Sequence, residues 1–398
     1  MSLKIPHWYL WGVQAYGLGV RLTARWNAKA QKWTSGRKNW RLRLREKCAD
    51  LDHPYWIHCA SLGEFEQGRP LIEALREKHP SRPIVLTFFS PSGYEVRKNY
   101  TGADVVFYLP LDTPANARDF VQIVNPRVAI FVKYENWLFF HAELDQQSVP
   151  RFLISARFRA DQIFFKSHGK VFREALKGFH HIFVQDQASL DLALSIELGN
   201  VTVTGDTRFD RVMTIKNGAQ KDPKLESWKA EGPVLIIGSS WAPEEALAAK
   251  YWSGPLIIAP HEVNEEHLKA IEDRFPEAQR YTQTEELSSR VVLIDTIGLL
   301  SNLYQYADGA MIGGAFGKGL HNTLEAAVWS IPVFFGPKYE NFIEAKGLLE
   351  AGGAVSLSSD QDWTQIPEPS AWPEMGEKAS SFVAQNTGAT SKILDRID

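Results

Sequence analysis

The feature that most constrains the fold is a regular alternation of short apolar runs with amphipathic segments, which begins at residue 54. Runs such as PYWIHCA, PIVLTFF and VAIFVKY follow one another up to about residue 206, and segments with helical spacing such as PLIEALREKH lie between most of them. Strands joined by helices form right-handed βαβ units, so this rhythm predicts a mainly parallel sheet. The same rhythm returns in PVLIIGSS, PLIIAP and GAMIGGA. We therefore predict an α/β protein with two Rossmann-like domains.

The breaks in this rhythm predict the domain boundaries. Residues 210–232 are polar and carry Asn-Gly, Asp-Pro and Glu-Gly breaks, which are typical of a linker. We expect an amino-terminal segment over 1–50, a first domain over 51–209, this linker, and a second domain over 233–398. The segment from Ala371 onward is expected to be helical and able to cross back to the first domain. Two such domains facing each other would leave a cleft suited to two different ligands.

Composition narrows the class of protein. The 398 residues, 44% hydrophobic and 23% charged, are enough for two folded domains. The net charge of -3 argues against general nucleic-acid binding. Cys48 and Cys59 have no Cys or His partner at metal-ligand spacing, which argues against a disulfide framework and a structural zinc site and favours a reducing cytoplasm.

The amino-terminal segment differs in kind from the rest. The aromatic run WYLWGVQAYGLGV, residues 8–20, is shorter than the roughly 20 residues that span a bilayer. A basic tract from Arg21 to Lys47 follows, in which Glu46 is the acidic residue. Aromatic anchors beside a basic tract predict a segment that lies on an anionic membrane face. The alternative is a solvated basic helix that packs on its own domain.

Glu64 is the first candidate for chemistry. In WIHCASLGEFEQGRPLI, residues 56–72, a buried strand ends at Ala60-Ser61, the chain turns through Gly63, and a helical pattern follows Glu64. Ligands of open α/β sheets bind outside the carboxyl ends of strands, so Glu64 is placed as a general acid or base. The alternative is that its carboxylate complements the positive end of the helix.

Further polar side chains follow other expected strands of the first domain. Ser90 and Ser92 end one strand, Glu135 follows Lys133 after another, and Arg157 and Arg159 follow a third. Such basic and hydroxyl groups at one sheet edge suit an anionic acceptor.

The second domain contains a glycine-rich turn in MIGGAFGKGLHNTLEAA, residues 311–327. Gly313 and Gly314 allow close backbone approach, and a helix expected to begin near His321-Asn322 offers N–H groups to a phosphate. Glu325 is placed to accept the hydroxyls of a ribose. A simple tight turn is the alternative. Ser239, Ser240 and His261 end neighbouring strands, where they either cap helices or contact the same ligand.

Taken together, these motifs resemble the 3-deoxy-D-manno-octulosonic acid (Kdo) transferases of lipopolysaccharide synthesis, which have the GT-B fold. The matching stretches run in the family's order along nearly the whole chain, and the most specific are ASLGE at 60–64 and HNTLE at 321–325. The others are TFFSPSGYE, YENW, SARF, GDTRFDR, GSSWAPEE and FGPKYENF.

The resemblance implies an inverting transfer of Kdo from CMP-Kdo to a lipid A precursor at the cytoplasmic face of the inner membrane. CMP-Kdo is then a co-substrate, and neither a cofactor nor a metal is implied. Glu64 would be the general base, with acceptor contacts at Ser61, Gly63, Ser90, Ser92, Glu135 and Arg157. Donor contacts would be Arg208, Ser239, Ser240, His261, Gly313, Gly314, His321, Asn322 and Glu325.

The chain departs from the family pattern at Lys133, Arg208 and His261, where the family has an acidic residue, a lysine and an arginine. The change at His261 bears on how the phosphate is neutralised. Two other functions remain open at this point: a soluble sugar-nucleotide epimerase or hydrolase of the same fold, and a non-catalytic module that binds lipid surfaces through the basic tract.

Overall fold

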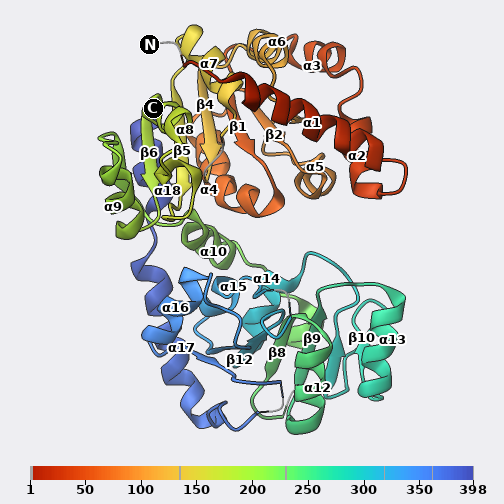
Figure 1. Cartoon of the computed structure of the whole chain (residues 1–398). Helices are drawn as coiled ribbons and strands as arrows, with labels where there is room; N and C mark the ends of the chain where they lie inside the picture. Colours follow the sequence, from red (N-terminus) through yellow and green to blue (C-terminus); the bar gives the residue numbers. More distant parts are fainter. Residues whose placement is uncertain (1–2, 134–135, 229–230, 318, 361, 398) are drawn as a thin grey trace. The chain divides into compact units, whose positions relative to one another are not determined.

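The chain forms two compact units, each built on a parallel sheet with helices on both faces (Figure 1). The computed structural model describes residues 3–133, 136–228, 231–317, 319–360 and 362–397. The first unit comprises Met1–Arg211 and Gly388–Asp398, and the second comprises Val212–Thr387. The predicted α/β fold with two Rossmann-like sheets is confirmed.

The first unit has a seven-stranded sheet in the order β3-β2-β1-β4-β5-β6-β7. The order reverses between β1 and β4, so the carboxyl ends of these strands mark the point where such sheets bind ligands. The strands are Tyr55–Cys59, Ile84–Phe88, Val105–Tyr108, Val128–Val132, Arg151–Ala156, His181–Val184 and Val201–Val203. The helices after them are α4 Leu62–Lys78, α5 Pro91–Arg97, α6 Pro114–Val124, α7 Leu138–Gln146, α8 Lys170–Lys177, α9 Gln187–Ser195 and α10 Thr207–Asn217.

The inner strands of this sheet are mainly apolar because both faces are covered. Along β1, Trp56 packs with Phe120 and Phe131 in one core, whereas Tyr55 and Ile57 belong to the core on the opposite face. This alternation follows from the two-residue period of a strand, and a sheet buried on both sides therefore reads as a continuous apolar run.

The last helix, α18 (Ala389–Ile397), belongs to the first unit and packs on α4. Its Ile393 and Ile397 join the core that contains Leu71 of α4. Asp210 fixes the start of the helix, since its carboxylate accepts the Thr390 backbone N–H at 2.7 Å and the Thr390 hydroxyl at 2.6 Å.

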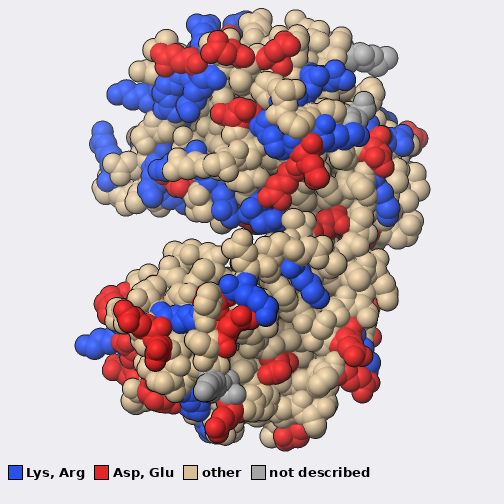
Figure 2. All heavy atoms as spheres, turned by 180° about the vertical axis from the view of Figure 1, so that it is seen from behind, with Lys and Arg blue, Asp and Glu red and all other residues tan. Residues whose placement is uncertain are grey.

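The amino-terminal residues form three helices: α1 (His7–Thr23), α2 (Ala28–Gly36) and α3 (Trp40–Cys48). Helix α3 contributes Trp40 and Leu44 to the core, whereas α1 exposes large apolar side chains, Trp11 by 66%. No helix among the described residues is long and apolar enough to cross a bilayer. On the face seen in Figure 2, the first unit carries several groups of Lys and Arg.

Asp112 attaches α1 to the rest of the unit. Its buried carboxylate accepts the Tyr9 hydroxyl at 2.6 Å and the backbone N–H groups of Phe139 and Phe140, at 3.2 and 3.0 Å. The last two are orphan donors of the first turn of α7, so one carboxylate caps α7 and holds α1. Burial raises the pKa of Asp112 to about 7, although these hydrogen bonds oppose the shift.

The second unit has a seven-stranded parallel sheet in the order β10-β11-β9-β8-β12-β13-β14, which reverses between β8 and β12. The short edge strands β10 and β14 were not expected from the sequence, because Gln279–Arg280 is polar and Ala354–Ser356 contains one large apolar residue, Val355. The other strands are β8 Leu235–Ser240, β9 Leu256–Pro260, β11 Val291–Leu293, β12 Gly309–Ile312 and β13 Val333–Phe335. The helices are α11 Pro223–Glu226, α12 Ala242–Tyr251, α13 Glu265–Arg274, α14 Leu300–Leu303, α15 Leu324–Ala327, α16 Ile343–Glu350 and α17 Trp372–Gln385.

The segment expected as a linker, 210–232, is helical over part of its length. It holds the end of α10 and all of α11, whose start is capped by Asp222. Trp228 is buried and its indole N–H donates to the Ser289 carbonyl at 2.8 Å. From Val212 onward the described part of this segment therefore packs within the second unit.

We predict that Asp112→Ala destabilises the protein by about 3 kcal/mol, because three hydrogen bonds of roughly 1 kcal/mol each are lost. The folded-state pKa of Asp112 lies above its ordinary value, so the stability from its protonated form is greatest below about pH 4 and is lost as the pH rises through about 7. Urea unfolding of the wild type and of Asp112→Asn, which does not titrate, checks this. The stability difference should shrink from about pH 5 to about pH 8, and a constant difference would contradict it.

Candidate active site

Glu64 lies directly beyond the carboxyl end of β1. Ser61 is the N-cap of α4, and Glu64, three residues later, accepts the Ser61 backbone N–H at 3.1 Å. This is the carboxylate half of a capping box. The side chain is largely buried, with 9% of its surface exposed. The alternative expected from the sequence, a carboxylate at the positive end of the helix, is therefore present. The geometry also leaves Glu64 where a base is needed, and that role remains a prediction.

The loops after β1 and β2 are joined at this edge. The Ser90 backbone N–H donates to the Ala60 carbonyl at 2.7 Å, and the Ser90 and Ser92 hydroxyls lie 2.9 Å apart. A Cβ at Gly63 would meet no atom within 4 Å, so the first turn of α4 is open here. The structure thus brings Ser61, Gly63, Ser90 and Glu64 to one sheet edge.

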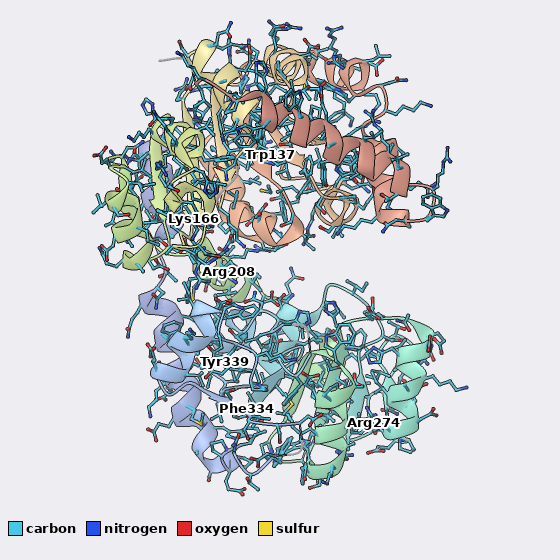
Figure 3. The ribbon with its side chains drawn as sticks, viewed as in Figure 1. Trp137, Lys166, Arg208, Arg274, Phe334 and Tyr339 are labelled. Atoms are coloured by element: carbon cyan, nitrogen blue, oxygen red, sulfur yellow. The ribbon has the colours of Figure 1, made fainter. Side chains whose placement is uncertain are left out.

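An ion pair that the sequence did not predict lies beside α4. Asp206 is buried and accepts two hydrogen bonds from the Arg208 guanidinium, at 2.9 and 2.7 Å, and one from Gln67 at 3.5 Å. Burial opposes ionisation of Asp206, but the charge and hydrogen bonds of Arg208 outweigh it, together with Lys133, and its pKa is lowered. Arg208, predicted as a donor contact, lies in the first unit (Figure 3). The motif GDTRFDR could have indicated this ion pair, because Asp206 and Arg208 stand two residues apart in it.

Arg157, a predicted acceptor contact, follows the end of β5. Ser155 has a left-handed backbone with φ of 51°, at an irregularity in the pairing of β5 with β6. Its hydroxyl lies 3.1 Å from that of Thr207, which in turn donates to the Gln67 carbonyl at 2.5 Å. Arg157 follows at the same edge and is half-buried. Glu135 lies outside the described residues.

In the second unit, the glycines after β12 allow close approach of two loops. A Cβ on Gly313 would stand 2.0 Å from the Ser239 carbonyl oxygen, and Gly314 has φ of +95°. Glu244, a residue not predicted, joins these loops. Its buried carboxylate accepts the Gly314 N–H at 2.9 Å and the Trp241 N–H at 3.1 Å. Burial raises the pKa of Glu244, against these hydrogen bonds.

Two predicted donor contacts form an aromatic stack at this turn. The rings of His261 and His321 are stacked at 4.2 Å, and the Trp241 ring lies 5.0 Å from His261. The Trp241 indole N–H donates to His321 Nε2 at 3.3 Å. Burial, with a smaller effect of His261, lowers the pKa of His321 to about 4, so its ring is neutral at pH 7. These three rings line a pocket of about 560 Å³ with Gly314 and Phe342.

The helix expected to begin near His321-Asn322 begins later, since α15 is the short segment Leu324–Ala327. Asn322 accepts the Leu324 N–H at 3.2 Å and donates to Glu325 at 3.0 Å. The other carboxylate oxygen of Glu325 accepts the Ser301 hydroxyl at 3.0 Å. Glu325 and Asn322 therefore do share a face, and Ser301 is a partner that sequence spacing did not indicate.

Ser239 and Ser240 differ in accessibility. Ser240 is fully buried and its hydroxyl donates to Glu245 at 2.8 Å, and Glu245 also pairs with His267 and Arg274. The Ser240 hydroxyl, which was predicted to contact the donor, therefore belongs to a structural network that joins β8, α12 and α13. Ser239 is half-buried, with φ of 51°.

Solved structures with the same fold define the class. UDP-GlcNAc 2-epimerase from Neisseria meningitidis, bound to UDP-GlcNAc, matches with a TM-score of 0.59 and 17% identity over 86% of this chain and 99% of its own. MurG from Acinetobacter baumannii matches with a TM-score of 0.50 and 10% identity over 86% and 99%. At such low identity these matches show the fold alone, and the fold is that of the GT-B proteins.

Sequence relatives narrow the class. Residues 26–211 match the family model described as 3-deoxy-D-manno-octulosonic-acid transferase (kdotransferase). The 3-deoxy-D-manno-octulosonic acid transferase of Bordetella pertussis is 28% identical over 88% of both chains, and that of Aquifex aeolicus is 29% identical over 75% of this chain and 80% of its own. The chain is thus a relative of the Kdo transferases, and the resemblance expected from its motifs is confirmed.

We predict that Gly314→Ala destabilises the second unit by about 1–3 kcal/mol, because a left-handed backbone is strained for alanine. A Cβ there would also lie 2.3 Å from the Gly319 carbonyl. Gly317→Ala in the same turn is the matched control, since its Cβ would meet only the Gly314 carbonyl at 3.6 Å. Urea unfolding measures the stability of both variants, and equal stabilities would contradict the strain expected from a side chain at Gly314.

Proposed function

We propose that the protein is an inverting glycosyltransferase that moves Kdo from CMP-Kdo to a lipid A precursor. The observation that carries this proposal is the Glu64 carboxylate, held at the carboxyl end of β1 by the Ser61 N–H, within the residues matched by the family model. Relatives named Kdo transferases support the same reaction. The solved epimerases share only the fold, so an epimerase or hydrolase function is not favoured.

In the proposed reaction, Glu64 takes the proton from the acceptor hydroxyl as its oxygen attacks the anomeric carbon of Kdo. The new C–O bond forms on the face opposite the leaving group, and the bond from the anomeric carbon to the CMP phosphate oxygen breaks. CMP leaves with the electron pair. Ser90 and Ser92, joined to the Glu64 loop through Ala60, are in place to bind acceptor hydroxyls, and Arg157 supplies positive charge at the same edge.

The second unit would hold the donor. Gly313 and Gly314 leave the backbone after β12 open to close approach, because neither carries a side chain there. Glu325, fixed by Asn322 and Ser301, presents a carboxylate of the kind that binds ribose hydroxyls. Since His321 is neutral at pH 7, it contributes stacking and hydrogen bonding to the donor and no positive charge.

We further propose that the first unit associates with the anionic cytoplasmic face of the inner membrane. Trp8, Trp11, Tyr16 and Leu18 of α1 are exposed aromatic and apolar side chains, and the basic tract from Arg21 to Lys47 follows them. Aromatic side chains that enter the interface, next to basic side chains, suit such a surface. A lipid-linked acceptor would be reached from there. Binding to lipid surfaces alone would not explain the relationship to transferases.

We predict that Glu64→Gln lowers the rate of Kdo transfer by about 10²–10⁴-fold, the range typical of a lost general base. The measurement is transfer to a lipid A precursor with CMP-Kdo generated in place. Glu66→Gln is the matched control, since Glu66 lies on the same helix and pairs with Arg97 at 2.9 Å. CMP binding, measured by calorimetry, should be unchanged in both variants. Transfer at the wild-type rate by Glu64→Gln would eliminate Glu64 as the base.

A further inference from the structure

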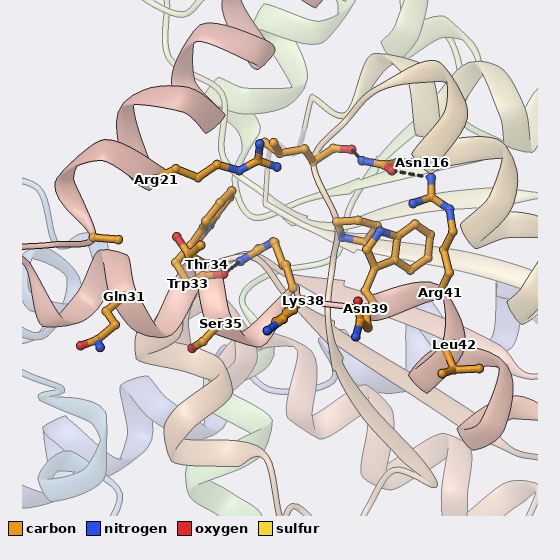
Figure 4. Close-up of a pocket in the computed structure, with 15 residues that line it drawn as sticks. Arg21, Gln31, Trp33, Thr34, Ser35, Lys38, Asn39, Arg41, Leu42 and Asn116 are labelled. Carbon is orange, nitrogen blue, oxygen red and sulfur yellow. Dashed lines mark hydrogen bonds between the residues drawn. The ribbon is translucent and has the colours of Figure 1, made fainter.

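A large basic pocket lies in the first unit among α1, α2, α3 and the loop after β3 (Figure 4). Its volume is about 950 Å³, and none of the described residues that line it is acidic. It shares no lining residue with the edge that carries Glu64 and Ser90. The cations that line it are Arg21, Arg37, Lys38 and Arg41.

Two of these cations are engaged within the protein. Arg41 pairs with Asp119 at 2.6 Å and donates to Asn116 at 2.9 Å, as the dashed line in Figure 4 shows for Asn116. Arg37 donates to the carbonyls of Leu109, Phe89 and Trp33 at 2.8, 2.7 and 3.1 Å. Its guanidinium therefore sits in the wall of the pocket without a carboxylate partner among the described residues, and adds positive charge there.

The other two cations have no such partners. Arg21 and Lys38 are exposed, and in the described part of the chain no acceptor forms a hydrogen bond or ion pair with either side chain. Both line the pocket from different helical segments, Arg21 from the end of α1 and Lys38 from the turn before α3. Two unpaired cations facing one cavity, beside the half-buried guanidinium of Arg37, form a site suited to an anion with several oxygens.

An apolar pocket of about 410 Å³ borders α1 as well. It is lined mainly by Trp8, Gly12, Val13 and Tyr16 of α1, and by Phe89 and Trp137 from the sheet edge. Leu111 lines both pockets, and it packs closely on α1, where a Cβ on Gly17 would stand 2.5 Å from Leu111 Cδ1. The same helix therefore borders a cationic cavity and an apolar cavity.

We propose that α1 and its neighbours form a binding site for a single phosphorylated lipid, with the phosphate at Arg21 and Lys38 and an acyl chain in the apolar pocket. This differs from a diffuse attraction to anionic membranes, because it requires specific cations and a specific cavity. It is argued from the first unit alone and stands whether or not the protein transfers Kdo. The adjoining Phe89, bound by Arg37, directly precedes Ser90, so an occupied site would lie next to the proposed acceptor edge.

The phosphate half is tested with vesicles of phosphatidylcholine that contain either phosphatidic acid or phosphatidylserine, matched in measured surface potential. We expect the full-length wild type to bind vesicles with phosphatidic acid more tightly than those with phosphatidylserine. In Arg21→Gln/Lys38→Gln the ratio of the two affinities should fall about tenfold, which is the effect of one lost charge-assisted hydrogen bond. Arg25→Gln/Lys32→Gln removes the same charge from residues that do not line the pocket, and it should keep the preference. Equal preferences in both double variants would overturn the proposal.

The lipid half is tested with Gly12→Leu, which places a side chain in the apolar pocket, where a Cβ at Gly12 would meet no atom within 4 Å. Gly19→Leu adds the same apolar group to the same helix outside both pockets, again without a clash. We expect weaker binding to phosphatidic acid vesicles for Gly12→Leu than for Gly19→Leu. Binding of glycerol 3-phosphate, a headgroup without chains, should be equal in the two variants. If that soluble phosphate binds as tightly as the vesicles, the site takes a free phosphate and the lipid proposal fails.

Discussion

The organisation of both units depends on one local interaction, a carboxylate in the first turn of the helix that follows the first strand. In the first unit Glu64 accepts the N–H of the cap residue Ser61, and in the second Glu244 accepts that of Trp241, at 3.1 Å in both. Each interaction closes a strand–turn–helix corner beside the point where the strand order reverses.

The two carboxylates differ in their surroundings. Glu244 is fully buried and binds the Gly314 N–H as well, so it joins the glycine-rich turn to α12 and serves the structure. Glu64 is also buried but keeps 9% of its surface exposed, and the loop that precedes it is joined to the loop of Ser90. The same capping geometry serves a structural role at Glu244, and at Glu64 it is compatible with the catalytic role that we propose.

The sequence predicted much of the fold because parallel strands covered on both faces are continuous apolar runs. The strands β10 and β14 were missed because Gln279–Arg280 is polar and Ala354–Ser356 contains one large apolar residue, Val355. At the site, motif spacing found the pairing of Asn322 with Glu325, which is local. It did not find Asp206 beside Gln67, or Glu244 at Gly314, because those contacts join segments far apart in the chain. The burial of Ser240 was not predicted, because the spacing of residues in a motif does not show which side chains are accessible.

The charge of the pocket that we propose for the donor depends on the side chains that line it. Its described lining contains no Lys or Arg, and His321 is neutral because burial lowers its pKa to about 4. Lys338 is the cation that the structure attaches to this turn, since its amine donates to the Gly317 carbonyl at 2.9 Å. Stacking and backbone N–H groups therefore dominate this pocket, as they do in sites that bind planar bases. A histidine at position 261, whose ring lies 5.0 Å from that of Trp241 and 4.2 Å from that of His321, fits such a pocket through its ring contacts.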